Sequence, residues 1–321
     1  MNKISAFLKL IRFKNLLIIA LIQVVIKFSL INAYLDNSAL KNNEFLFYLL
    51  ALITIVAAGY IINDIYDIET DKINKSEIRV VEKELSKNFA FKAYYLLNLI
   101  GIASGFYAAY QVNKLWLGII FIYFVISLWR YSKQYKTSFF IGNLQVAFLT
   151  ALSIINLVLY DLIPVGMIRI DDGSKIILFI ILFYSGFSFL TTLVREIIKD
   201  IEDIEGDKKT NANTLAILVG VQKTKLIIIF LNTLPILGIA YFQYFQYSVL
   251  NSTFTVNLSY WGVNKIAAIY TLFLQLLFVL LLIKIINSET RVDFHFASKL
   301  CKIIMLSGIL SIPLFTYLHL R

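Results

Sequence analysis

Apolar residues recur along the chain in stretches of about 20 positions that are separated by short polar segments. A stretch of this length crosses a hydrocarbon core of about 30 Å as a helix, and no closed-barrel alternation of polar and apolar residues is visible. The pattern predicts helices over residues 15–35, 45–62, 89–110, 114–129, 139–160, 175–194, 224–245, 264–287 and 299–320. We therefore expect an all-α integral membrane protein, a bundle of nine transmembrane helices in which residues 1–321 form a single domain.

Composition supports this interpretation. Hydrophobic residues make up 59% of the 321 positions and charged residues 16%, and the mean hydropathy is +0.77. A soluble globular domain does not have this balance. Residues 1–14 combine apolar positions with Lys3, Lys9 and Arg12, which predicts a short interfacial helix and not a cleavable signal.

The distribution of positive charge predicts the orientation. Of the 30 basic residues, 22 lie in or beside the N-terminal arm and the loops after the second, fourth, sixth and eighth spans. Such residues are retained on the cytoplasmic side, so the N-terminus is expected inside and the C-terminus outside. Two cations fall within spans: Lys92 is expected to snorkel, and Lys27 to find a polar partner or tilt out. The net charge of +10 is then mainly a topology signal, with anionic lipid or an anionic substrate as a second cause, and it does not call for nucleic acid.

An acidic phrase occurs twice. IINDIYDIETDK (61–72) and IIKDIEDIEGDK (197–208) match at nine of twelve positions, and each follows an even-numbered span. Self-similarity at equivalent places indicates a bundle of two related halves, here in parallel orientation. Each half would carry an aspartate-rich loop on the cytoplasmic side.

The spacing within the phrase indicates a metal site. The acids are three and then four residues apart, so on a helix they share one face: Asp64, Asp67, Asp71 and Asp200, Asp203, Asp207. Hard oxygen donors suit Mg²⁺, which is usually held by carboxylates together with substrate phosphates. Solvated loop charges are the alternative, but they would not repeat at equivalent places, and the calcium-loop spacing of an EF-hand is missing. Nearby cations can contact phosphate oxygens: Lys72, Lys75, Arg79, Lys199, Lys208 and Lys209.

Four segments carry a resemblance to a known family. NDIYDIETDKINK and REIIKDIEDIEGDKKTNANTLAILVG resemble the two aspartate-rich motifs of the UbiA superfamily of intramembrane prenyltransferases. LIRFKNLL, with Arg12 and Asn15, and YSKQYKTSFFIGNLQVA, with Gly142 and Asn143, are similar to further family segments. The chain departs from the family pattern at Ser76, Ile78 and Ala216, where a proline, a base and a proline are common.

The resemblance implies roles for individual residues. Mg²⁺ bound to the donor diphosphate would be held by Asn63, Asp64, Asp67, Asp71, Asp200, Asp203 and Asp207. Asp67 and Asp203 would be catalytic, together with Lys136 and Tyr131, which would contact the diphosphate or orient the allyl group. The diphosphate would also meet Lys72, Arg79 and Lys208.

The implied reaction transfers a prenyl group from an allylic diphosphate to a lipophilic acceptor. Neutralising the leaving diphosphate lowers the barrier, and an apolar tunnel shields the cation from water. Aromatic residues on spans that lead to polar loops are candidates for its wall, although core packing explains each as well: Tyr123, Tyr184, Phe187 and Phe189.

The sequence of the second motif resembles that of the family branch that transfers a geranylgeranyl group to the hydroxyl of geranylgeranylglyceryl phosphate. The partners would be geranylgeranyl diphosphate, that acceptor and membrane lipid; no protein partner is implied. Glu196 or Asp200 would accept the hydroxyl proton, unless Glu196 only pairs with Arg195 or Lys199. Aromatic acceptors of quinone synthesis or a porphyrin side chain are alternatives. A cation-coupled carrier is an alternative of another class, although carriers place acids at mid-membrane.

Overall fold

The structure, a computed structural model, describes residues 3–35, 38–74, 79–165, 172–245 and 264–320. Within these ranges nine helical segments are long and apolar enough to cross a membrane, which confirms the predicted number. They are Phe13–Tyr34, Asn42–Tyr66, Lys87–Gln111, Leu115–Lys133, Ile141–Leu162, Ile177–Glu202, Val221–Tyr244, Lys265–Ile286 and Arg291–Leu320. Ser76 and Ile78, two of the positions that depart from the family pattern, lie outside the described residues.

Long helices form the spans and short helices join them. The first span is α2 (Phe13–Val24), the π-helix η1 (Val25–Ile31) and α3 (Asn32–Tyr34). The others are α4 (Asn42–Tyr66), α6 (Lys87–Gln111), η2 (Leu115–Gly118) with α7 (Ile119–Lys133), α8 (Ile141–Leu162), α9 (Asp172–Glu202), α12 (Val221–Phe245), α15 (Lys265–Ile286) and α16 (Arg291–Leu320). The short helices are α1 (Lys3–Leu10), α5 (Ile68–Asn74), η3 (Tyr135–Thr137), α10 (Ile204–Lys209) and α11 (Leu215–Val219).

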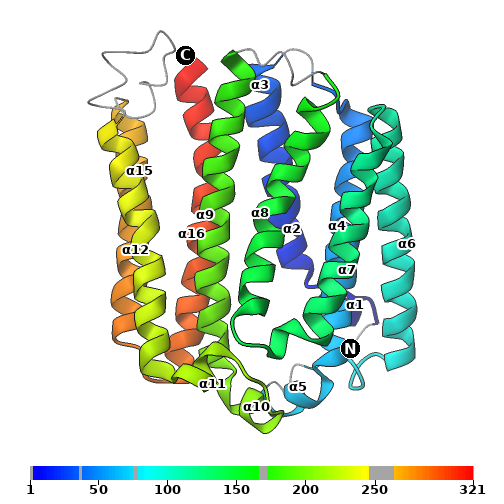
Figure 1. The fold of residues 1–321 in the computed structure, drawn as a ribbon, viewed down its shortest axis with the longest axis vertical. Helices are drawn as coiled ribbons and strands as arrows, with labels where there is room; N and C mark the ends of the chain where they lie inside the picture. The colour runs from blue at the N-terminus through cyan, green and yellow to red at the C-terminus, as the bar shows by residue number, and fades with distance from the viewer. Residues whose placement is uncertain (1–2, 36–37, 75–78, 166–171, 246–263, 321) are drawn as a thin grey trace.

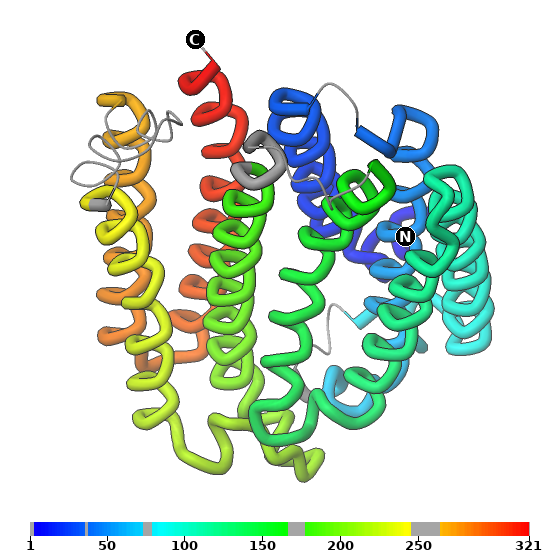
Figure 2. The backbone as a smooth tube through the Cα atoms, turned by 45° about the horizontal axis from the view of Figure 1, so that its top comes forward, coloured from blue at the N-terminus to red at the C-terminus, as the bar shows by residue number. Residues whose placement is uncertain are grey.

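The spans run roughly side by side, with α6 at one edge of the bundle and α12 and α15 at the other (Figures 1 and 2). The short helices α1, α5 and α10 lie together at one end, and the last turn of α16 lies at the opposite end (Figure 1). We call the first of these the acidic end, because α5 and α10 carry the repeated acidic phrase. Residues distant in sequence thus meet at a single end of the bundle.

Small residues allow α6 to pack closely against its neighbours. A Cβ atom on Gly101 would lie 2.5 Å from the side chain of Ile55 on α4, and one on Gly105 would lie 2.3 Å from the ring of Phe121 on α7. Two glycines four residues apart form the small-xxx-small pattern by which membrane helices approach each other. The side chains of Ile55 and Phe121 occupy the space that a larger residue would need.

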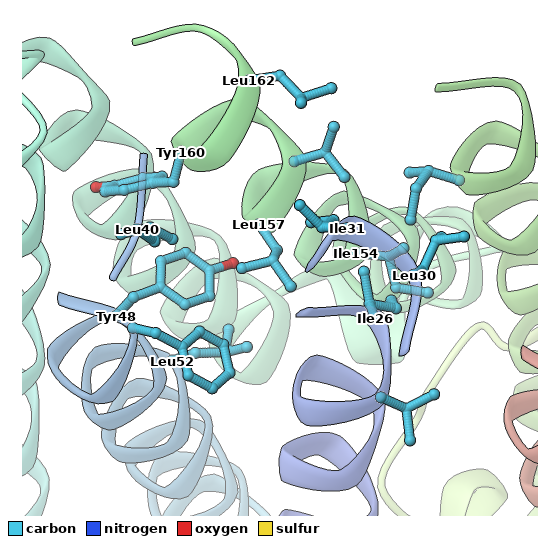
Figure 3. Packing of buried hydrophobic residues seen from close by; sticks show 14 of the residues in the cluster. Ile26, Leu30, Ile31, Leu40, Tyr48, Leu52, Ile154, Leu157, Tyr160 and Leu162 are labelled. Atoms are coloured by element: carbon cyan, nitrogen blue, oxygen red, sulfur yellow. The ribbon is translucent and has the colours of Figure 1, made fainter. Parts of the chain in front are cut away.

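Away from the acidic end the core is aromatic and apolar (Figure 3). The ring of Tyr48 lies 5.1 Å from that of Tyr160 and 5.7 Å from that of Phe121, with both pairs edge to face. The hydroxyl of Tyr160 donates to the carbonyl of Gly105 at 3.2 Å, so the polar atom of this buried ring is satisfied. These contacts tie α4, α6, α7 and α8 together.

Lys27 finds a polar partner inside the bundle, one of the two predicted outcomes. Its ammonium donates to both carboxylate oxygens of Asp161 at 2.9 Å and to the hydroxyl of Ser38 at 2.8 Å. The backbone N–H of Leu40 also donates to Asp161. Both charged side chains are almost completely buried, so each depends on the other. Lys92, in contrast, is exposed.

Four helices extend beyond the predicted spans by four residues or more. The second span continues from 62 to Tyr66, the fourth from 129 to Lys133 and the sixth from 194 to Glu202, and the ninth begins at Arg291 instead of 299. Hydropathy falls at these ends because they carry charged residues, but the backbone remains helical. The repeated acids consequently begin inside the last turns of α4 and α9, not in loops.

Candidate functional site

A cavity of about 270 Å³ opens between six helices of the bundle. Its wall is built from positions three or four apart, as expected for one face of each helix. On the first span these are Ile18 and Ile22 of α2 and Ile26 of η1, and on α16 they include Met305, Ile309 and Ile312. The interior is therefore apolar over most of its depth.

The end of the cavity near α5 and α10 is polar. Charged and polar side chains line it from both sides: Arg12, Asn15, Asn63, Tyr131, Lys136, Arg195, Glu196, Lys199 and Lys302. An apolar chamber with a charged mouth suits a ligand that has a charged head and a long apolar tail.

Both copies of the acidic phrase fold in the same way. Each long helix ends one residue before an aspartate, and a short helix begins one residue after it. Asp67 has φ −85° and ψ 2°, and Asp203 has φ −98° and ψ 5°. The short helices α5 and α10 pack against each other, so the two phrases face one another.

The first acidic phrase is held by cations. Arg12 donates to Asp64 at 2.8 Å, and its guanidinium lies 4.8 Å from the centroid of the Tyr60 ring. Lys136 donates to Asp67, which also accepts a hydrogen bond of 2.6 Å from Asn63. Burial lowers the pKa of Lys136, but the carboxylates of Asp67 and Asp71 outweigh it, so the pKa is raised and the ammonium stays charged. Cations of the protein itself thus neutralise Asp64 and Asp67.

The second acidic phrase is contacted by an amide and by a guanidinium. Asp200 accepts from the amide of Asn143 at 3.0 Å, and Asp203 lies 3.8 Å from the guanidinium of Arg291. Burial raises the pKa of Asp207 to about 6, Lys136 opposes this, and the carboxylates of Asp203 and Asp67 add to it. Mutual repulsion of carboxylates from both phrases indicates that the site has room for further positive charge.

Carboxylates and an amide oxygen are suitable ligands for Mg²⁺. Among the described residues, however, no three acidic, histidine or cysteine side chains already converge as a metal-binding group. The charge and chemistry of the donor set fit the metal, and Lys136, which lies among these acids, would have to give up Asp67 to it.

The loop that carries Lys136 is contacted from two sides, by Asn213 and by the start of α8. The N–H of Asn213, which follows α10, donates to the carbonyl of Thr137 at 2.8 Å. On the other side, a Cβ atom on Gly142 would lie 2.5 Å from the carbonyl oxygen of Tyr135 and 3.1 Å from the Cα of Lys136. Only glycine permits the start of α8 to approach this loop so closely.

We expect Gly142→Ala to displace Lys136 and to lower kcat/KM by about ten- to a hundredfold, because small misplacements of catalytic groups have large effects. Overpacking should cost about 1–3 kcal/mol of stability. Steady-state kinetics and thermal unfolding in detergent measure both. Gly186→Ala is the matched control, since nothing lies within 4 Å of a Cβ atom there. Equal losses of activity in both variants would contradict the explanation.

The other predicted diphosphate ligands lie away from the cavity wall. Lys72 is exposed and pairs with Glu69, and Lys208 is exposed on α10. Arg79 does not line the cavity, and its Nε and Nη1 atoms are buried with no hydrogen-bond partner among the described residues. Of the cations predicted to contact phosphate, Lys136 and Lys199 line the cavity, and Lys75 lies outside the described residues.

The aromatic candidates divide into two groups. Tyr131, Tyr184 and Phe187 line the cavity. Phe189 instead packs against a separate apolar cluster, and Tyr123 is exposed on the bundle surface. Core packing or lipid contact is therefore the structural role of the latter two.

Glu196 pairs with both of its neighbours on α9. Arg195 donates to it at 2.6 Å, and the ammonium of Lys199 lies 3.8 Å away. The predicted pairing alternative for Glu196 is thus present in the structure.

Arg195 and Lys302 line the cavity, but sequence reasoning did not single them out as site residues. Lys302 was assigned to the topology signal, and Arg195 only to the pairing of Glu196. The sequence did contain a signal for them. Both are cations about one helical turn or more inside a long apolar helix, where a charged side chain is costly and therefore indicates a function.

Comparisons with known proteins agree with this geometry. The sequence profile of the UbiA prenyltransferase family matches residues 24–300. The digeranylgeranylglyceryl phosphate synthase of Methanosphaera stadtmanae is 31% identical over 271 residues, 84% of this chain and 87% of that protein. The synthase of Sulfolobus acidocaldarius is 32% identical over 244 residues, 72% of this chain and 78% of that protein.

Solved structures are similar in fold. A structure of a digeranylgeranylglyceryl phosphate synthase has a TM-score of 0.62 at 24% identity and covers 98% of this chain and 99% of its own. A UbiA homologue from Archaeoglobus fulgidus, bound to GPP and Mg²⁺, has a TM-score of 0.57 at 15% identity and covers 96% of this chain and 99% of its own.

Proposed function

Because this chain belongs to the UbiA prenyltransferase family, we propose that it transfers a geranylgeranyl group from geranylgeranyl diphosphate to the hydroxyl of geranylgeranylglyceryl phosphate. The product would be an ether lipid. The observation that carries this proposal is the cavity, because its charged mouth between the two acidic phrases opens into an apolar chamber. The names of the relatives support the choice of acceptor.

We assign the donor diphosphate to the acidic end of the cavity. Mg²⁺ would be held by oxygen atoms of the two phrases, from Asn63, Asp64, Asp67, Asp71, Asp200, Asp203 and Asp207. When bound, the metal neutralises charge on the leaving diphosphate. The GPP and Mg²⁺ bound to the Archaeoglobus homologue support this assignment.

Residues of the chain supply the remaining functions. Lys136 exchanges Asp67 for a diphosphate oxygen and stabilises the negative charge that develops as the allylic C–O bond breaks. Tyr131 lies on the cavity wall beside this bond and helps to orient the allyl group. The isoleucine-rich wall holds the tail and keeps water from the cation.

The acceptor hydroxyl loses its proton as the ether bond forms. A carboxylate that is paired with two cations holds a proton weakly, so Glu196, between Arg195 and Lys199, is the poorer base. Asp200, which accepts a hydrogen bond of 3.0 Å from the amide of Asn143 and forms no ion pair within 4 Å in the described part of the chain, is the better candidate when the other carboxylates hold the metal. An aromatic acceptor would not need a base that removes a proton from an alcohol.

The repeat and the orientation remain part of the proposal. The matching backbone angles at Asp67 and Asp203 support two related halves. The excess of cations at the acidic end supports placing it on the cytoplasmic side of the cell membrane. The acids at the ends of spans also fit a transferase better than a cation-coupled carrier.

The direct test uses membranes that contain the protein, labelled geranylgeranyl diphosphate and each candidate acceptor in turn. We expect Mg²⁺-dependent ether formation with geranylgeranylglyceryl phosphate, and loss of activity to background with EDTA. Mg²⁺ added in excess of EDTA should restore it. Product with dihydroxynaphthoate or hydroxybenzoate, and none with the glyceryl phosphate, would favour the aromatic alternative. Activity that survives EDTA would contradict the metal assignment.

A further inference from the structure

Two cations line the cavity on the wall formed by α9 and α16, apart from the residues assigned to the donor. Arg195 donates to Glu196 through Nη1 at 2.6 Å, and Lys302 donates to the amide oxygen of Asn15 at 3.3 Å. The second bond joins the first and last spans at the mouth of the cavity. We call Arg195, Lys302 and Asn15 the basic wall.

The basic wall has unused binding capacity. The Nε atom of Arg195 is buried and has no hydrogen-bond partner among the described residues. Lys302 forms no ion pair within 4 Å in the described part of the chain, and its hydrogen bond to Asn15 is long and made to a neutral group. A buried donor without a partner costs free energy, so its presence at a cavity indicates a ligand.

Charge at this wall is not balanced by the protein. The positive charges of Arg195, Lys199 and Arg12 repel the ammonium of Lys302, and the negative charge of Glu196 attracts it. Arg12 pairs with Asp64, and Glu196 is shared between Arg195 and Lys199. Positive charge from several cations therefore surrounds Lys302, which favours an anionic ligand.

We propose that Arg195 and Lys302, with Asn15, bind the phosphate monoester of the acceptor. This inference rests on the proposed function. A phosphate monoester carries the charge that the wall lacks, and the guanidinium of Arg195 can donate to its oxygens through the free Nε.

The position of the wall fits this role. The donor residues Asp67 and Lys136 come from α4, its C-cap and the η3 loop, whereas the basic wall comes from α9, α16 and the start of α2. Phosphate and free hydroxyl share one three-carbon glycerol unit in the acceptor, so a phosphate on this wall turns the hydroxyl toward the cavity centre. The wall would also reject uncharged acceptors, which leave its two cations uncompensated in a low-dielectric mouth.

The test measures both substrates separately in the purified full-length protein. Lys302→Gln should raise the KM for geranylgeranylglyceryl phosphate by about ten- to a hundredfold, the usual effect of losing a charged hydrogen bond. The KM for geranylgeranyl diphosphate should change by less than about twofold, because its diphosphate is assigned to Lys136 and the metal-holding carboxylates and not to Lys302. Arg195→Gln should act in the same direction, and Lys302→Arg should restore most of the affinity.

A second probe is the same acceptor without its phosphate, geranylgeranylglycerol. The wild type should use it poorly. In Lys302→Gln, the ratio of kcat/KM for the phosphorylated acceptor to kcat/KM for geranylgeranylglycerol should be smaller than in the wild type. Lys299→Gln is the matched control, since it removes the same charge three residues away on an exposed position of α16. Its kinetics should equal those of the wild type.

The outcomes separate the two proposals. A wild type that does not use geranylgeranylglyceryl phosphate overturns the proposed function. A wild type that uses it, with Lys302→Gln leaving the acceptor KM unchanged or raising the donor KM instead, overturns the basic wall alone. If Arg195→Gln does not fold, Lys302→Gln and Lys302→Arg still decide the question.

Discussion

Replacing Asp67 with asparagine is expected to lower kcat by about a thousandfold, one of the two largest effects of any single change at the acidic end. The substitution keeps the shape of the side chain but removes the charge that holds Lys136 and, under the proposed mechanism, the metal. Asp203→Asn, at the equivalent position of the second phrase, should have an effect of similar size. Steady-state assays with saturating Mg²⁺ and donor measure both.

Two acids in the same short helices provide controls for these variants. Glu69 is exposed on α5, where it pairs with Lys72, and Glu205 is exposed on α10. Glu69→Gln and Glu205→Gln should retain near-wild-type activity. A further readout is stabilisation by Mg²⁺ with diphosphate, which should shift Tm in the controls but not in Asp67→Asn. If all four variants were equally active, the acidic phrases would not be the site.

Replacing Lys27 with methionine is expected to destabilise the protein by about 3–5 kcal/mol, because it leaves the buried carboxylate of Asp161 without its charged partner. The pair lies at the opposite end of the bundle from the acidic phrases, so the kinetics of the protein that remains folded should change little. Thermal or denaturant unfolding in detergent gives the stability.

Two further variants test the cause of this loss. Lys92→Met removes the other cation within a predicted span, but its side chain is exposed, so the loss should stay below about 0.5 kcal/mol. The double variant Lys27→Met, Asp161→Asn removes both charges and should recover much of the stability. A double variant no more stable than Lys27→Met would mean that packing at Lys27 matters more than charge.

Hydropathy predicted the number of spans because each helix must bury about 20 apolar residues in the membrane. It misplaced their inner ends for a physical reason. Glu196 and Asp200 belong to the last turns of α9, but Glu196 lines the polar end of the cavity and Asp200 accepts a hydrogen bond from Asn143 of α8. An average over a window registers their charge and not the direction they face. The same limitation affects Asp64 in α4.

The acidic phrases were visible in the sequence because their spacing repeats, and the structure brings α5 and α10 together. The long-range partners at the site were not predictable. Lys136 contacts Asp67, 69 residues away in the sequence, and Lys302 contacts Asn15, 287 residues away. Such contacts depend on how the spans are arranged around the cavity, and sequence spacing carries no information about that arrangement.

The ion pairs at the acidic end also predict how the metal and the donor depend on each other. A divalent cation that arrives alone must displace Lys136 from Asp67, and a diphosphate that arrives alone draws Lys136 away and leaves Asp67 uncompensated. Each ligand supplies the partner that the other removes, so the two should bind with positive cooperativity, each tightening the other by the same factor. Until both are present, Lys136 stays paired with Asp67.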